Sequence, residues 1–241
     1  MVGAAALERT GSSDPAVIRQ DTEAPMVTDH LGENADDLIG DLRALRKPRM
    51  FIISGPSGVG KDTVIEALRL RFPEAYFAVT ATTRQRRPGE IDGVHYYFMD
   101  MEAFETRLGE GEFLESALVY GNRYGVPRGP IRAALARGQD VFVKVDIQGS
   151  DSIRSLVPRA TSVFIAPESM GSLLQRLRAR KTDDPDALMK RFGTASRELA
   201  SAGEFDYVIF NESDRVDQAV ECIVAVVMAE RFRTEQHEIH L

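Results

Sequence analysis

"MFIISGPSGVGKDTV", Met50 to Val64, decides the fold of this 241-residue chain. An apolar run leads into a glycine-rich segment, and Val64, Ile65 and Leu68 then follow at helical spacing. Residues 55–61 match the pattern G-x-x-x-x-G-K, in which backbone N–H groups between a strand and a helix surround phosphate oxygens. The sequence therefore predicts a strand, a phosphate-binding loop and a helix in this order.

Asp62 departs from the pattern, which places Ser or Thr there to bind Mg²⁺. Mg²⁺ also accepts carboxylate oxygens, so Asp62 is a tentative metal ligand. Alternatively, the hydroxyl of Thr63 takes over part of that role. Lys61 supplies a positive charge for the β- and γ-phosphates. The residues predicted to bind the nucleotide phosphates are Gly55, Pro56, Ser57, Gly58, Val59, Gly60, Lys61, Asp62 and Thr63.

Apolar segments alternate with helical ones beyond the loop, which predicts an α/β fold: a parallel sheet in a three-layer core with helices on both faces. Strands are expected at 50–54, 75–81, 141–145, 161–166 and 206–210, and helices at 130–136, 149–156, 170–180, 184–199 and 215–231. Residues 83–126 break this alternation with "VHYYFM", a helix near 102–108 and "FLESALVY". We expect a small mixed α+β insertion there.

The ends of the chain differ from this domain. Residues 1–46 are poor in aromatics and predict a largely disordered extension with a short helix at 35–45. Residues 47–232 are expected to form the domain, and 233–241 a C-terminal tail. The net charge of −7 argues against a nucleic acid polymer as partner.

The composition also bears on the compartment. Cys222 is the single cysteine, so the chain can form no internal disulfide, and its apolar surroundings predict a buried thiol on a helix. The sequence shows neither an apolar run of bilayer length nor a secretory signal at its start. We expect a cytoplasmic protein without a membrane partner.

Two further stretches contain polar groups that suit a phosphorylated acceptor. Arg84 and Arg87 lie in a predicted loop ahead of Tyr96, and guanidinium groups bind phosphate in a bidentate manner. A solvated basic loop is the alternative. Glu115 lies in an otherwise apolar strand, where a buried carboxylate is costly without a partner. Its alternative is a surface position at a strand edge.

The motifs GPSGVGKD, TTRxxRPGExDGVHYYF, FLE, YGNxYG and VDIQG follow one another in this order. Together they resemble the guanylate kinase family over residues 49–228. The resemblance implies Mg²⁺-assisted transfer of the γ-phosphoryl group of ATP to GMP, a step in purine nucleotide metabolism. It also implies a parallel-sheet core, a GMP-binding insertion at 83–126 and a mobile helical lid at 176–192.

The resemblance assigns roles to single residues. Arg84, Arg87, Tyr96 and Tyr124 are expected to bind the GMP phosphate, and Thr80 and Glu115 the guanine, with Asp146 as a further substrate-binding residue. Lys61, Arg180 and Arg191 are the expected catalytic cations, and Asn211 is expected to contact the ATP base. The two oxygens of a carboxylate independently match N1–H and N2–H₂ of guanine.

Two more positions depart from the family pattern. Val126 stands where the family often has Ser or Thr against guanine, and Lys144 where many members have an acidic residue near the metal. Two other functions stay open, a non-catalytic guanylate-kinase-like binding module and a related sugar-phosphate kinase. The module is expected to lack the loop and lid cations, and the sugar-phosphate kinase has no use for Glu115. The chain is expected to be a monomer or a homodimer.

Overall fold

The computed structural model describes residues 35–44, 46–119, 121–179, 185–234, 239 and 241. The chain divides into two units, Met1–Arg43 and Ala44–Leu241. Helix α1 (Ala35–Ala44) begins in the first unit, where the sequence predicts a short helix, and every other described element belongs to the second.

The core of the second unit is a parallel sheet in the order β2-β7-β1-β8-β9. Its central strand is β1, the apolar run that precedes the glycine-rich loop. The prediction of a parallel sheet is confirmed. The strands are β1 (Met50–Ser54), β2 (Tyr76–Phe77), β7 (Val141–Lys144), β8 (Thr161–Pro167) and β9 (Tyr207–Asn211).

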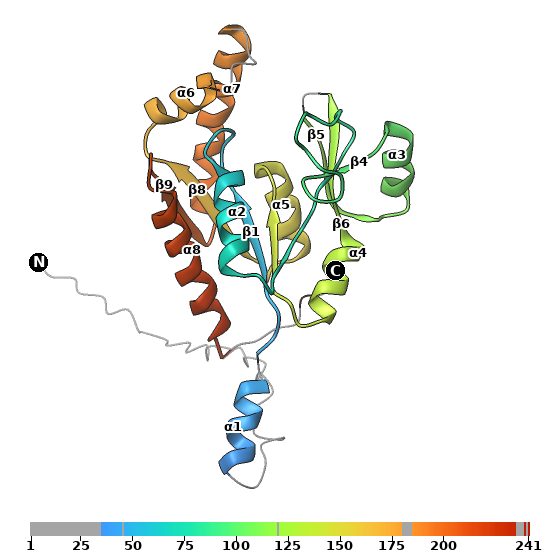
Figure 1. Ribbon diagram of the computed structural model, residues 1–241, viewed down its shortest axis with the longest axis vertical. Helices are drawn as coiled ribbons and strands as arrows, with labels where there is room; N and C mark the ends of the chain where they lie inside the picture. Colours follow the sequence, from blue (N-terminus) through green and yellow to red (C-terminus); the bar gives the residue numbers. More distant parts are fainter. Residues whose placement is uncertain (1–34, 45, 120, 180–184, 235–238, 240) are drawn as a thin grey trace, which may run out of the picture. The chain divides into compact units, whose positions relative to one another are not determined.

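Helices cover both faces of this sheet (Figure 1). Phe51 and Ile53 of β1 pack in one apolar cluster with α2 (Lys61–Arg71) and α8 (Val216–Arg231). Met50 and Ile52 point the other way, into a cluster with α4 (Arg128–Ala136) and α5 (Ile147–Leu156). Successive side chains of a strand alternate between faces, so β1 serves both halves of the three-layer core.

The insertion forms a second sheet in the order β4-β3-β6-β5. Its strands β3 and β4 are parallel, whereas β6 is antiparallel to both β3 and β5, as predicted for a mixed insertion. The ring of Phe104 in α3 stacks on that of Phe113 in β5, which packs the helix against this sheet. The elements are β3 (Ala81–Thr82), β4 (Tyr97–Phe98), α3 (Met101–Gly109), β5 (Phe113–Val119) and β6 (Asn122–Pro127).

The single strand predicted at 75–81 is wrong, because the chain passes from one sheet to the other within it. Phe77 of β2 stacks on Phe142 in the core, with ring centroids 4.7 Å apart. Ala81 of β3 packs instead in the cluster of the insertion. Thr80 lies between the two short strands and therefore between the two sheets.

Helices α6 (Met170–Ala179) and α7 (Pro185–Ala200) pack on each other through Leu173, Leu177 and Ala195. A short 3₁₀ helix, η2 (Ser201–Glu204), follows α7 and leads into β9.

The thiol of Cys222 is exposed, so its predicted burial is wrong. Helix α8 directs Val220, Ile223 and Val227 into the core, and position 222 falls outside that buried face. Among the described residues, none of the helices combines the length and apolar character needed to cross a bilayer.

Candidate functional site

The glycine-rich loop joins the end of β1 to the start of α2, and the structure explains why two of its positions require glycine. Gly55 has φ 141°, and a Cβ atom there would lie 2.3 Å from the carbonyl oxygen of Ile165. Gly60 has φ 100°, and its Cβ atom would lie 2.5 Å from Nδ2 of Asn211. Both conformations favour glycine, and both positions leave no room for a methyl group.

Side chains from distant elements support the loop from behind. Asn211, only 4% exposed at the end of β9, donates from Nδ2 to the carbonyl oxygen of Val59 at 2.8 Å. Arg176 of α6 donates to the same oxygen at 3.0 Å and to the carbonyl oxygen of Asn211 at 3.0 Å. These bonds fix the loop, and contact between Asn211 and a nucleotide base stays a prediction.

Two charged groups besides Arg176 contact the loop directly. Glu198 of α7 accepts a hydrogen bond from the backbone N–H of Ser57 at 3.2 Å. The Lys61 ammonium donates to the carbonyl oxygens of Gly55 and Pro56 at 2.5 and 3.2 Å. Burial lowers the pKa of Lys61 to about 8, although Glu198 and Asp62 act to raise it. Glu198 and the loop carbonyl oxygens thus occupy groups, the Ser57 N–H and the Lys61 ammonium, that phosphate oxygens bind in loops of this pattern.

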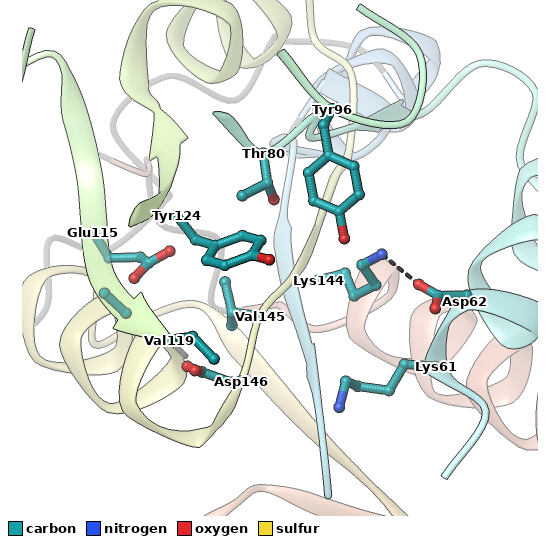
Figure 2. A pocket seen from close by; sticks show the side chains of 11 residues that line it. Lys61, Asp62, Thr80, Tyr96, Glu115, Val119, Tyr124, Lys144, Val145 and Asp146 are labelled. Carbon is teal, nitrogen blue, oxygen red and sulfur yellow. Dashed lines mark hydrogen bonds and ion pairs between the residues drawn. The ribbon is translucent and has the colours of Figure 1, made fainter. Parts of the chain in front are cut away.

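A cavity opens between the loop and the insertion (Figure 2). We call it the carboxylate cavity, because Glu115 and Asp146 lie together on one of its sides. Most residues predicted to bind the acceptor line it together with the start of α2. Its lining residues are Lys61, Asp62, Thr80, Tyr96, Glu115, Ala117, Val119, Tyr124, Lys144, Val145 and Asp146.

Glu115 is 8% exposed in β5, and burial, with a smaller effect of Asp146, raises its pKa to about 8. The predicted buried carboxylate is therefore present on the cavity wall. Val126 of β6 pairs with Glu115 across the sheet, but its side chain is fully buried in the core. Position 126 accordingly gives the cavity no polar group.

Gly149 is a residue that sequence reasoning missed. Asp146 caps the N-terminus of α5 and accepts a hydrogen bond from the backbone N–H of Gly149 at 2.8 Å. A Cβ atom on Gly149 would lie 3.0 Å from Oε2 of Glu115. Glycine in the first turn of a predicted helix, within the motif VDIQG, was the available signal.

A second cavity adjoins the first and shares Asp62, Thr80, Tyr96, Tyr124 and Lys144 with it. We call it the arginine cavity, because it adds three arginines to these shared residues. They are Arg69, Arg84 and Arg87.

Glu90, also missed from the sequence, organises the predicted arginine loop. Its carboxylate accepts two hydrogen bonds from Arg84, at 2.7 and 3.1 Å, and one from the backbone N–H of Arg87 at 2.7 Å. These contacts hold the pKa of Glu90 below its usual range, the bond from Arg84 contributing most. The Arg84 guanidinium also lies 5.3 Å from the ring centre of Tyr96.

Asp62 and Lys144 form an ion pair of 2.5 Å (Figure 2). Both residues line both cavities. Thr63, the alternative magnesium ligand, is exposed on α2 and lines neither cavity. The described residues contain no group of three or more His, Cys, Asp or Glu able to hold a metal ion. Arg180 lies outside the described residues, and Arg191 lies on α7 with a side chain that is not described.

Comparisons with known proteins agree on one family. The family model described as guanylate kinase matches residues 47–230. The guanylate kinase of Carboxydothermus hydrogenoformans is 43% identical over 80% of this chain and 93% of its own length. That of Symbiobacterium thermophilum is 45% identical over 78% and 89%. A crystal structure of guanylate kinase from Anaplasma phagocytophilum matches with a TM-score of 0.64 and 29% identity, over 78% of this chain and 89% of that one.

Proposed function

Because the chain belongs to the guanylate kinase family, we infer that it transfers the γ-phosphoryl group of ATP to GMP, giving ADP and GDP. The observation that carries this inference is the carboxylate cavity, where buried Glu115 and the loop cation Lys61 line one space. A group that suits guanine and a group that suits the phosphates of ATP are thus brought together.

Glu115 selects the base of the acceptor. Its two oxygens accept N1–H and one N2–H of guanine, whereas adenine has an acceptor at N1 and lacks the 2-amino group. Adenine would leave a buried carboxylate without partners, and sites of this kind reject the wrong partner by about 10⁴–10⁵-fold. Thr80 and Asp146 are proposed to bind the acceptor beside Glu115, since both line the same cavity.

The arginine cavity is proposed to hold the phosphate of GMP. Arg84 and Arg87 line it, and Tyr96 and Tyr124 lie where the two cavities join. Guanidinium groups and phenolic O–H groups donate hydrogen bonds to phosphate oxygens. The arginine cavity reaches Asp62, which follows the loop cation Lys61 at the start of α2.

ATP is proposed to bind with its phosphates on the loop. Residues 83–126 then serve as the acceptor-binding insertion, and residues 176–192 as a lid that brings Arg180 and Arg191 to the transferring phosphoryl group. Phosphoryl transfer depends on positioning and charge stabilisation, and one arginine contributes about 10³–10⁵ in rate. A closed lid also excludes water from the reaction.

The family implies a metal ion, and we propose Mg²⁺ that arrives bound to the phosphates of ATP. The described residues at the loop do not fit a metal held by the protein. Asp62 already bonds the Lys144 ammonium, and Thr63 is exposed and lines neither cavity. A cytoplasmic location, proposed from the sequence, stays a prediction, as does the choice between monomer and homodimer.

Two other functions were open from the sequence, and neither is favoured. A non-catalytic module does not require Lys61 and Glu115 in one cavity, and the relatives reported above are named as guanylate kinases. A sugar-phosphate acceptor would leave Glu115 buried without a base to bind.

The test is ADP release from ATP with GMP, AMP, CMP, UMP or a pentose bisphosphate precursor as the acceptor. We expect turnover with GMP, and a loss of at least about 10²-fold in kcat/KM for GMP in Glu115→Gln. Turnover with the sugar phosphate alone, or a folded protein inactive with every acceptor, would contradict the proposed function.

A further inference from the structure

The Asp62–Lys144 pair joins two elements that meet at the phosphate loop. Asp62 is the second residue of α2, and Lys144 is the last residue of β7. Strand β7 pairs with β1 so that Lys144 lies beside Ile53, close to where the chain enters the loop. Both side chains therefore face the point where the loop would present the phosphates of ATP.

Phosphate-loop enzymes commonly hold Mg²⁺ with two groups, a Ser or Thr hydroxyl that follows the loop lysine and a carboxylate from another strand. In this chain a carboxylate, Asp62, stands at the hydroxyl position. An ammonium, Lys144, stands at the end of the neighbouring strand. The ammonium weakens a metal site, and the structure shows that it bonds Asp62, the carboxylate that could otherwise bind the metal.

The usual hydroxyl–carboxylate pair and the Asp62–Lys144 pair differ in net charge. A hydroxyl with a carboxylate has a charge of −1 until a cation arrives, so ATP phosphates meet repulsion when metal is absent. The Asp62–Lys144 pair is neutral without any metal. The ammonium has three N–H donors, of which Asp62 takes one, and Lys144 lines both cavities.

We propose that Lys144, positioned by Asp62, binds the β- and γ-phosphate oxygens of ATP and takes the place of a metal held by the protein. This inference rests on the proposed function, because it assigns the phosphates on the loop to ATP. Lys144 is the group that touches substrate, and Asp62 is a positioning residue.

The surroundings of Lys144 keep its ammonium group charged. Burial acts to lower its pKa, but the charge of Asp62 and the hydrogen bond to Asp62 outweigh burial and leave the pKa raised. The Tyr96 ring, with its centre 5.8 Å from Nζ, covers the ammonium on the side of the insertion. The cation is therefore present before ATP binds.

The measurement is the dissociation constant of ATP for the full chain without GMP, by calorimetry, once in Mg²⁺ and once in EDTA. For the unchanged chain we expect the two values to agree within about threefold. Lys144→Met should weaken ATP binding in EDTA by at least about tenfold, the usual cost of losing a charge-assisted hydrogen bond. Asp62→Asn should have a smaller effect in the same direction.

Two further variants separate this role from general damage. Asp62→Ser combined with Lys144→Asp rebuilds the hydroxyl and carboxylate, so ATP binding should become at least about tenfold tighter in Mg²⁺ than in EDTA. Arg71→Met breaks the ion pair between Arg71 and Glu221, which lies outside both cavities, and should leave the ATP dissociation constant unchanged in both media.

GMP phosphorylation in Mg²⁺, measured on the same preparation, separates the two levels of the proposal. Turnover of GMP together with ATP binding that falls more than about threefold in EDTA, or that persists in EDTA in Lys144→Met, would overturn the role of Lys144 and leave the function intact. Absence of both turnover and ATP binding would overturn both. Turnover with ATP binding that persists in EDTA, and is lost in Lys144→Met, supports the proposal.

Discussion

The first turn of α5 lies against the Glu115 carboxylate at Gly149, where an added Cβ atom would be 3.0 Å from Oε2 and 3.1 Å from Cδ. The Cβ atom of Val145 would lie 3.1 Å away as well. A methyl group there must displace Glu115, because backbone and core side chains hold the other neighbours. The absence of a side chain at Gly149 thus allows the Glu115 carboxylate to stay where we propose that it binds guanine.

Gly149→Ala should raise KM for GMP by about fivefold to tenfold, because displacement by a few tenths of an ångström disturbs two hydrogen bonds at once. The KM for ATP and kcat should change little, since the lost interaction is one of acceptor binding. Gly129→Ala in α4 is the matched control, because a Cβ atom there meets nothing within 4 Å. Equal effects of both substitutions on KM for GMP would contradict the assignment.

The raised pKa of Glu115 makes GMP binding dependent on pH. With a pKa of about 8 the carboxyl is largely protonated at pH 7, whereas pairing with guanine requires the ionised form. Binding therefore releases a proton, and GMP affinity should rise about fivefold between pH 7 and pH 8. Calorimetry in buffers of different ionisation enthalpy measures that proton directly.

Glu115→Gln is the control for this pH dependence. It removes the titrating group, so the remaining weak affinity for GMP should be flat over the same interval. A slope of GMP affinity that persists in this variant would assign the titration to another group. The pKa of Lys61, also about 8, is the nearest candidate, but Lys61 loses its charge as pH rises and would weaken phosphate binding. The two groups thus predict slopes of opposite sign.

The strand, loop and helix around the phosphate site could be predicted from the sequence, because glycine spacing and apolar periodicity are local properties. The strand predicted at 75–81 could not be divided correctly, since its two halves are equally apolar and only their partners, Phe142 and the insertion cluster, differ. Asp62 and Lys144 were each noted as departures, but their pairing joins positions 82 residues apart. Local patterns do not encode such contacts.

The candidate site residues likewise divide into those that local sequence indicates and those that depend on a distant neighbour. Glu115 could be predicted because a carboxylate in an apolar strand is conspicuous in itself. Glu90 could not, since a glutamate in a polar loop does not stand out, and glycine in the first turn of a helix indicates a close contact at Gly149 without naming its partner. Each acquires its role from one neighbour, Arg84 in the first case and Glu115 in the second.

Glu90→Gln should raise KM for GMP by about fivefold, although Glu90 is not assigned to the substrate. The variant removes the charge that holds the Arg84 guanidinium and the backbone of Arg87 in place. Glu105→Gln, which weakens an ion pair with Arg123 outside both cavities, should leave KM unchanged. Tighter GMP binding in Glu90→Gln would show instead that Glu90 competes with phosphate for Arg84.

Asn211→Ala tests whether the end of β9 supports the loop or also contacts the base of ATP. Loss of the bond to the carbonyl oxygen of Val59 should cost about 1–2 kcal/mol of unfolding free energy. The KM for ATP should rise severalfold while the KM for GMP stays unchanged, because Asn211 lies on the loop side of the site.

The choice of phosphoryl donor then separates the two roles of Asn211. If it acts only by holding the loop, the variant should lose activity to the same extent with ATP and with other nucleoside triphosphates, since all present the same phosphates. A larger loss with ATP would show that the side chain also recognises adenine. We expect equal losses, because Asn211 is almost fully buried and its amide nitrogen is already bonded to the loop.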